Sequence, residues 1–280
     1  MDRSSFLAPA RGGPLSGWSA GWGAPVVLLH GGPGLPFSSM DEVAAELVGD
    51  FRVASFQQRG LAPSTVEGPF TIEQALEDIV CVLDHLGWSR AYLVGHSWGG
   101  HLAFHAGVAM PDRLLGVLAV DPLGAVGDGG MALFEAEMWA RMPEADQARA
   151  RALEMRLTED DPSESDALEQ LRLGWPGYFA DPEHAPPMPP MRIGMPAQAL
   201  FGEIAAALPA LEASLPRVAV PVGVLVGAGS PMPPQEAGYD SAGRIPGAWV
   251  VEVPDAGHFP WLEVPGCVEA AMGRLSTARA

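Results

Sequence analysis

The sequence contains no lysine, and this absence excludes several kinds of chemistry. All 16 basic residues are arginine, so Schiff-base catalysis, a serine–lysine dyad and a phosphate-binding loop with its lysine are impossible. The only two cysteines, Cys81 and Cys267, cannot form a disulfide framework or a four-ligand zinc site. We expect Cys81 to be a buried core residue within a helix.

Positive charge is also scarce. The 34 acidic and 16 basic residues give a net charge of −18, and such a field repels phosphate backbones and anionic lipids. Nucleic acid and membrane surfaces are therefore poor partners, and no run approaches the roughly 18 apolar residues of a membrane span. The N-terminus lacks the apolar run of a secretory signal. We expect a soluble, cytoplasmic protein whose partner is a small-molecule substrate.

The pattern of apolar residues predicts an α/β fold. Hydrophobic residues make up 48% of the 280, which is enough to bury a large core. Short apolar runs alternate with longer helical patterns, as in a parallel sheet with crossover helices. The predicted strands are residues 25–30, 52–56, 91–95, 115–120, 222–227 and 249–253. A helix capped by Thr71 and ended by Gly87 follows the second strand, and a helix at 98–110 follows the third.

The alternation of strands and helices breaks between residues 122 and 221. This segment has helical stretches at 131–141, 144–157, 163–173 and 197–208 but no convincing strand, and it holds seven of the 12 methionines. We predict a core of residues 1–124 and 217–280, interrupted by a helical lid at 125–216. The lid is expected to enclose an apolar pocket lined by Met131, Phe134, Met138, Trp139, Trp175 and Phe179. The alternative is that these helices pack only on one another.

Residues 95–100, GHSWGG, carry the strongest chemical signal. Ser97 lies between an apolar run and a helical pattern, which is the context of a nucleophile elbow, and the flanking glycines permit the strained turn. A second G-x-S-x-G match at residues 17–21 lacks both the preceding strand and the following helix. Ser97 is therefore predicted to be the nucleophile, and Ser19 is not.

A nucleophilic serine needs a base and an oxyanion hole. His258 follows the last predicted strand near the C-terminus, which fits the chain order nucleophile, acid, base. Residues 30–34, HGGPG, follow the first strand, and glycine there permits close approach of backbone N–H groups to a substrate oxygen. We predict that Gly32 and Trp98 supply the two oxyanion donors and that His30 braces the turn.

The motifs HGGPG, GHSWGG and AGHFPWLE, in this order and spacing, resemble the α/β-hydrolase family over nearly the whole chain. HGGPG, together with Trp98 directly after the nucleophile, is most similar to the proline iminopeptidase-like branch, whose members have a helical cap after strand six. That branch usually carries D-Q-R-G-x-G-x-S, whereas residues 57–64 read QQRGLAPS. Epoxide hydrolases and haloalkane dehalogenases share the fold but use an aspartate nucleophile, and Ser97 argues against both.

The triad acid departs from the family pattern. Family members usually place an aspartate after the seventh strand, where residues 227–231 read GAGSP, and the neutral Ser230 cannot stabilise an imidazolium. Some relatives place the acid after strand six, where Asp121 stands. Since a carboxylate at the end of a buried strand needs a partner, we predict that Asp121 is the triad acid. Asp255, Asp240 and a serine–histidine dyad are the alternatives.

Two further patterns are ambiguous. His101 and His105 have the i, i+4 spacing of zinc ligands, but no third ligand is evident, so packing or hydrogen bonding is the expected role. The acidic run at residues 159–161 is expected to be a solvated helix end. In an iminopeptidase-like enzyme, acids of the lid could instead hold a substrate ammonium group.

The sequence thus predicts a serine hydrolase that cleaves a small, largely apolar ester, lactone, thioester or amide. Ser97 attacks, His258 relays the proton and Asp121 orients the base, and this mechanism needs no cofactor or metal. One alternative is an aminopeptidase acting on an N-terminal proline or another small residue. An alternative of another class is a ligand-binding or biosynthetic acyl-transfer or cyclisation protein on the same fold, which the loss of the acid at Ser230 favours.

Overall fold

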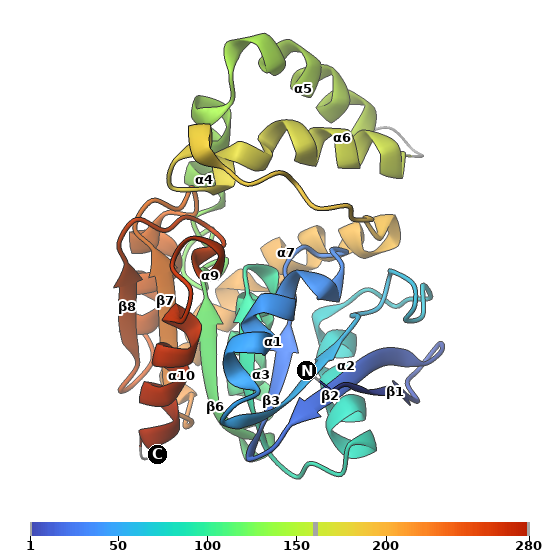
Figure 1. Cartoon of the computed structure of the whole chain (residues 1–280), viewed down its shortest axis with the longest axis vertical. Coiled ribbons are helices and arrows are strands. Elements are labelled where there is room, and N and C mark those ends of the chain that lie inside the picture. Colours follow the sequence, from blue (N-terminus) through green and yellow to red (C-terminus); the bar gives the residue numbers. More distant parts are fainter. Residues whose placement is uncertain (1, 159–161, 279–280) are drawn as a thin grey trace.

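An eight-stranded sheet organises the computed structural model, which describes residues 2–158 and 162–278 (Figure 1). The strands are β1 (Ser4–Ala8), β2 (Leu15–Gly21), β3 (Ala24–Leu29), β4 (Phe51–Phe56), β5 (Ala91–His96), β6 (Leu114–Val120), β7 (Val222–Gly227) and β8 (Trp249–Val253). Their spatial order is β1-β2-β4-β3-β5-β6-β7-β8. All pairs from β4 to β8 are parallel. The predicted α/β fold with a mostly parallel sheet is confirmed.

The two N-terminal strands were not predicted. β1 and β2 form antiparallel pairs at the edge of the sheet, and their serine and glycine content hides the alternation of apolar residues that marks a strand. Ser19 lies within β2, opposite Ser4 and Ala54. The second G-x-S-x-G match is therefore strand, with no elbow, as expected for Ser19.

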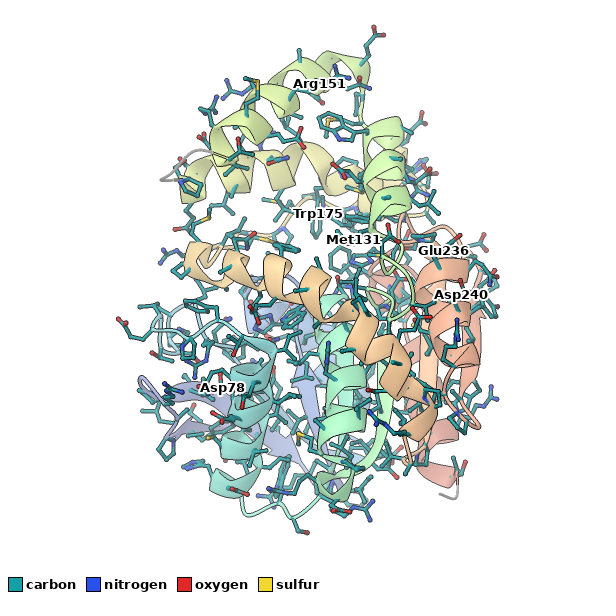
Figure 2. All side chains as sticks on the ribbon, turned by 180° about the vertical axis from the view of Figure 1, so that it is seen from behind. Asp78, Met131, Arg151, Trp175, Glu236 and Asp240 are labelled. Carbon is teal, nitrogen blue, oxygen red and sulfur yellow. The ribbon has the colours of Figure 1, made fainter. Side chains whose placement is uncertain are left out.

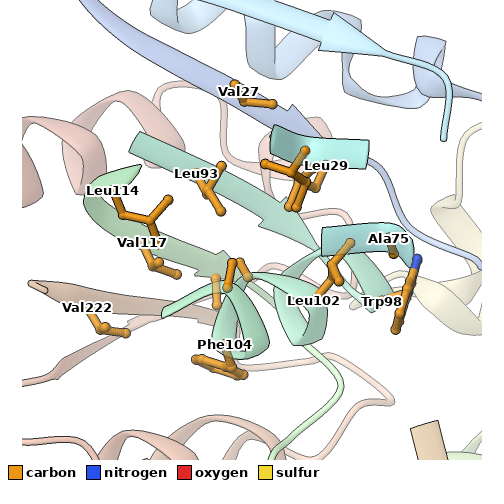
Figure 3. Close-up of a cluster of buried hydrophobic side chains, with 14 of the residues drawn as sticks. Val27, Leu29, Ala75, Leu93, Trp98, Leu102, Phe104, Leu114, Val117 and Val222 are labelled. Atoms are coloured by element: carbon orange, nitrogen blue, oxygen red, sulfur yellow. The ribbon is translucent and has the colours of Figure 1, made fainter. Parts of the chain in front are cut away.

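Helices cover both faces of the sheet because alternate side chains of each strand point to opposite faces. On β3, Val27 and Leu29 pack with the residues of α2 and α3, and Val26 and Leu28 pack with those of α1 and α10. Figure 3 shows the first of these clusters. The α-helices outside the insertion are α1 (Asp41–Leu47), α2 (Ile72–His85), α3 (Trp98–Ala109), α8 (Asp240–Gly243), α9 (Pro260–Glu263) and α10 (Cys267–Thr277), with short turns η1 (Phe37–Met40), η2 (Pro111–Arg113) and η7 (Pro234–Tyr239).

The start and end of α2 follow from its sequence. The Thr71 hydroxyl accepts the Gln74 N–H at 3.1 Å, which satisfies one free donor of the first turn. Gly87, at φ +69°, ends the helix. Cys81 lies in α2, as expected, and packs against the core, but it is only partly buried rather than buried.

Between β6 and β7 the chain inserts helices and short 3-10 turns. They are α4 (Met131–Arg141), α5 (Glu144–Leu157), α6 (Glu164–Gly174), η3 (Trp175–Tyr178), η4 (Pro182–His184), η5 (Met195–Ala199), α7 (Leu200–Ser214) and η6 (Leu215–Arg217). Figure 1 shows α4, α5 and α6 beyond the carboxyl end of the sheet, whereas α7 returns toward α2 and α3. α7 starts three residues later than predicted and continues past Pro209, because packing overrides the cost of an internal proline.

One helical run among the described residues, Met195–Arg217, is long and apolar enough to cross a membrane. In its most apolar stretch of 18 residues, 28% are buried. The sequence expectation of no such run is therefore wrong by this measure. In the structure, Leu200, Ile204 and Leu211 of this run belong to the same buried cluster as α2 and α3.

Candidate active site

The predicted elbow lies where β5 ends and α3 begins. Ser97 has φ +54° and ψ −117°, a strained conformation that presents its side chain at the tip of the turn. A side chain at Gly95 would overlap the carbonyl oxygen of Gly99, and one at Gly99 would overlap that of Leu29. The two glycines are therefore required for the turn and for the close approach of α3 to β3.

His258 and Asp121 meet at the carboxyl edge of the sheet. His258 Nδ1 donates to Asp121 Oδ2 at 2.5 Å, which leaves Nε2 free to act as a base. The Asp121 carboxylate also accepts the Gly227 N–H on Oδ1 at 2.9 Å and the Ser230 hydroxyl on Oδ2 at 2.5 Å. Because Asp121 and His258 are 1% and 4% exposed, this carboxylate is buried with both oxygens bonded.

Ser230 occupies the place where most family members carry the acid. It acts here as a neutral donor to the carboxylate that binds His258. Of the alternative acids, Asp255 is exposed and Asp240 accepts a hydrogen bond from Gln235. Within residues 2–158 and 162–278, neither alternative forms a hydrogen bond with His258.

The glycine-rich turn after β3 lies beside the nucleophile. A carbon added at Gly31 would lie 3.4 Å from Ser97 Cβ, and Gly32, at φ +118°, lines the same cavity as Ser97 and Trp98. The backbone N–H groups of Gly32 and Trp98 donate to no group in the described part of the chain. The two N–H groups predicted to bind the oxyanion are thus both unpaired and belong to residues that line the cavity with Ser97.

A buried network fixes this turn against α3. His30 Nδ1 donates to the Gly31 carbonyl at 2.8 Å, and its Nε2 accepts the Gln58 N–H at 3.0 Å. The Gln58 side chain donates to the His30 carbonyl and accepts the Trp98 indole N–H, both at 2.9 Å. Burial lowers the pKa of His30 to about 4, so the ring stays neutral and keeps its acceptor nitrogen.

A cavity of about 660 Å³ opens above Ser97 and His258. Five of the six predicted pocket residues line it: Met131, Phe134, Met138, Trp139 and Trp175. The sixth prediction is wrong: Phe179 does not line the cavity but is 1% exposed and packs against Trp175 and Phe259, two residues that do line it. Figure 2 places Met131 and Trp175 where the insertion meets the rest of the molecule.

The loop of His258 is held by the insertion as well as by the core. The His258 N–H donates to the Tyr178 carbonyl at 2.7 Å, and the Tyr178 ring stacks on the imidazole at 5.4 Å. The Glu263 carboxylate accepts the Gly257 N–H at 2.6 Å and the Ala180 N–H at 2.9 Å. The segment that follows α6 is therefore part of the frame that positions the base.

Sequence reasoning missed Tyr178, Gln58 and Glu263 as parts of the site. Gln58 and Glu263 stand inside the quoted motifs QQRGLAPS and AGHFPWLE, so the motif positions could have indicated them. Tyr178 stands in a 3-10 turn of the insertion, where neither periodicity nor a motif points to the site.

His96, directly before the nucleophile, belongs to the site: it lines the cavity, and its Nε2 donates to the His258 carbonyl at 2.8 Å. His101 and His105 do not line the cavity. His101 Nδ1 bonds with the Gly124 carbonyl at 3.1 Å, and its ring packs 5.0 Å from that of His105. Among the described residues no group of three or more potential metal ligands occurs. The acidic run at residues 159–161 lies outside the described residues.

The fold and the site define a class: an α/β protein with a strained nucleophile elbow at the carboxyl edge of its sheet. The family model of the alpha/beta hydrolase fold matches residues 24–265. The chain therefore belongs to the α/β-hydrolase family.

Three known proteins illustrate the similarity. Epoxide hydrolase B of Mycobacterium tuberculosis is 36% identical over 98 residues, which are 34% of this chain and 28% of that protein. A thermophilic esterase of Thermogutta terrifontis is 27% identical, with TM-score 0.66 over 98% of this chain and 97% of that one. The enol-lactonase of Burkholderia xenovorans shares the fold, with TM-score 0.69 and 23% identity over 98% of this chain and 100% of that one.

Proposed function

We propose that this protein is a serine hydrolase that cleaves a largely apolar ester, lactone, thioester or amide through an acyl-enzyme. The observation that carries the proposal is the strained elbow of Ser97, which shares one cavity with His258, while His258 is bonded to the buried Asp121. The insertion acts as the lid of this cavity. Its apolar lining favours a substrate that is apolar near the scissile bond.

The residues divide the reaction as follows. His258 Nε2 takes the proton from Ser97 Oγ while that oxygen bonds to the acyl carbon, and Asp121 stabilises the imidazolium. The Gly32 and Trp98 N–H groups bind the oxyanion. His258 then gives its proton to the leaving group, and a water molecule hydrolyses the acyl-enzyme by the same route.

The relatives bear on the substrate class. The protein named an esterase is similar over nearly its whole length, and the matches to proteins named epoxide hydrolases cover about a third of this chain. A serine at the elbow favours acyl transfer, because an oxyanion hole stabilises a tetrahedral intermediate of a carbonyl substrate.

A fluorophosphonate probe tests the proposal. The wild-type protein should be labelled once, on Ser97, and Ser97→Ala should lose both the label and the hydrolysis of p-nitrophenyl butyrate while keeping its melting temperature. Labelling that persists in Ser97→Ala, or turnover of styrene oxide but of no ester, would refute it. Labelling without turnover of any ester or amide would favour a ligand-binding or acyl-transfer protein.

A second candidate is an aminopeptidase of the iminopeptidase type. Glu135 and Glu154 line the cavity, whereas the ion pair of α4 with Arg141 is formed by another acid, Glu137. Carboxylates in this position favour a cationic substrate group. Comparison of prolyl p-nitroanilide with p-nitrophenyl butyrate separates the two candidates, since only an aminopeptidase should prefer the amide with a free amine.

A further inference from the structure

Tyr178 is the phenol of the cavity that stands nearest to the catalytic base. Its ring stacks on that of His258 with centroids 5.4 Å apart and planes 29° apart, and the ring of Phe134, which lines the cavity, lies 6.1 Å away. The backbone of Tyr178 is fixed as well, because its carbonyl accepts the His258 N–H at 2.7 Å. The position of this ring relative to the base is therefore set by two independent contacts.

The hydroxyl of Tyr178 is unpaired in the part of the chain that the structure describes. Within the described residues it forms no hydrogen bond, although the tyrosine is only partly exposed and lines the cavity. The hydroxyl oxygen is not one of the completely buried, unpaired polar atoms of the described residues, so it remains accessible. Burial raises the pKa of Tyr178 to about 12, so the hydroxyl keeps its proton. A protonated, unpaired donor therefore faces the cavity beside His258.

The side of the cavity on which this donor lies determines which substrate atom it can reach. In the proposed acyl transfer the oxyanion is bound by Gly32 and Trp98, whereas the leaving group must stand beside His258 to receive its proton. A phenol that covers His258 is thus on the side of the leaving group. Poor leaving groups depend on proton donation, while a stable anion such as p-nitrophenolate does not.

We infer that Tyr178 is a further catalytic residue, whose hydroxyl donates a hydrogen bond to the leaving-group oxygen of an unactivated alkyl ester or lactone. The inference rests on the proposed serine mechanism. In this step the bond between the acyl carbon and the leaving-group oxygen breaks. The proton that came from Ser97 passes from His258 to that oxygen, and Tyr178 keeps its own proton.

The test compares two substrates that give the same acyl-enzyme, ethyl butyrate and p-nitrophenyl butyrate. Tyr178→Phe keeps the ring and the backbone contact and removes only the hydroxyl. It should lower kcat/KM for ethyl butyrate by about 5- to 10-fold, the value of one neutral hydrogen bond. For p-nitrophenyl butyrate the change should stay below about 2-fold, because this leaving group needs no donor.

Tyr239→Phe is the matched control, since the Tyr239 hydroxyl is exposed and bonds to Glu252 at 3.1 Å. This variant should leave the ratio of the two substrates unchanged. An equal loss for both substrates in Tyr178→Phe, or no loss for either, would overturn the inference. The failure of the serine mechanism is seen separately, as absence of fluorophosphonate labelling in the wild type, whereas Tyr178→Phe should still be labelled on Ser97.

Discussion

The carboxyl edge of the sheet and the α5–α6 hairpin of the insertion are built in opposite ways. At the sheet edge, Asp121 is 1% exposed and each carboxylate oxygen has a donor. Among the described residues, the buried hydrophobic cluster of the hairpin consists of Ala150, Leu153 and Leu173. Ion pairs between partly or fully exposed side chains, such as Arg149 with Glu169, join its two helices.

The two regions suit two different tasks: holding the reacting groups in place and accommodating the substrate. Catalytic groups must be held within a fraction of an ångström, which a buried and fully bonded frame achieves. A wall that accepts apolar substrates benefits from few buried contacts and from adaptable side chains such as methionine. The segment around Tyr178 belongs to the first kind although it lies in the insertion, because it bonds to the loop of the catalytic base.

The largest effect is expected at the rigid edge. Asp121→Asn should lower kcat for p-nitrophenyl butyrate by a factor of about 10⁴, because the base loses the charge that stabilises its protonated form. The melting temperature should change little, since an amide can keep part of the hydrogen bonding. Asp255→Asn, at an exposed residue, is the control and should be silent; equal losses in both variants would contradict the role of Asp121.

Adding the acid at the usual family position should reverse part of that loss. The Ser230 hydroxyl lies 2.5 Å from Asp121 Oδ2, the oxygen that binds His258, so a carboxylate at 230 can reach the same imidazole. Asp121→Asn combined with Ser230→Asp should recover at least about tenfold in kcat over Asp121→Asn alone. Steady-state rates at one pH suffice, and no recovery would show that position 230 no longer serves the base.

Stability should also differ between the two regions. Arg59 and Asp78 form an ion pair at 2.6 Å with both side chains 3% exposed, so Arg59→Ala leaves a buried carboxylate without its cation. Urea unfolding should show a loss of about 3–5 kcal/mol. Arg149→Ala, which removes an exposed pair of the hairpin, should leave the urea midpoint unchanged. Similar shifts of the urea midpoint in Arg59→Ala and Arg149→Ala would contradict the difference in stability between the two regions.

The pH dependence of stability should come from the rigid region. Burial lowers the pKa of His30 and of His101 to about 4, from 6.5. Below pH 6.5 the unfolded chain binds more protons than the folded one. The free energy of unfolding should therefore fall as the pH is lowered from 6.5 to about 4, whereas above pH 6.5 the histidines should not reduce it. His184 of the insertion is exposed and its pKa is raised by Asp181, which acts in the opposite direction. A His101→Gln variant should show a shallower slope in equilibrium urea unfolding; an unchanged slope would argue against this origin.

The smallest effect is expected in the wall of the cavity. Trp139 lines the cavity and packs against the core of the hairpin, so Trp139→Ala lengthens the space. The ratio of kcat/KM for p-nitrophenyl octanoate to that for the butyrate should rise about 4- to 15-fold, a range set by one or two newly buried methylenes. Trp22→Ala, at a residue that is 70% exposed, should leave this ratio unchanged, and a matching change there would contradict the placement of the pocket.

How far the sequence could predict this structure depends on how local the determinants are. The six strands β3 to β8 and the elbow of Ser97 follow from apolar runs and from glycine spacing. The pairing of Asp121 with His258 was predicted from the chemistry of a buried carboxylate, and the structure places the two in contact. The antiparallel edge of β1 and β2 gave no such signal, and Phe179 and Tyr178, adjacent in sequence, could not be told apart without tertiary packing.

The most direct test of the central claim is to trap the covalent intermediate. Acid quenching during steady-state turnover of p-nitrophenyl butyrate, followed by intact mass measurement and peptide mapping, should find a single butyryl group on Ser97. The group should be absent from Ser97→Ala. A butyryl group on another residue such as Ser19, or full turnover by Ser97→Ala without any adduct, would contradict the account.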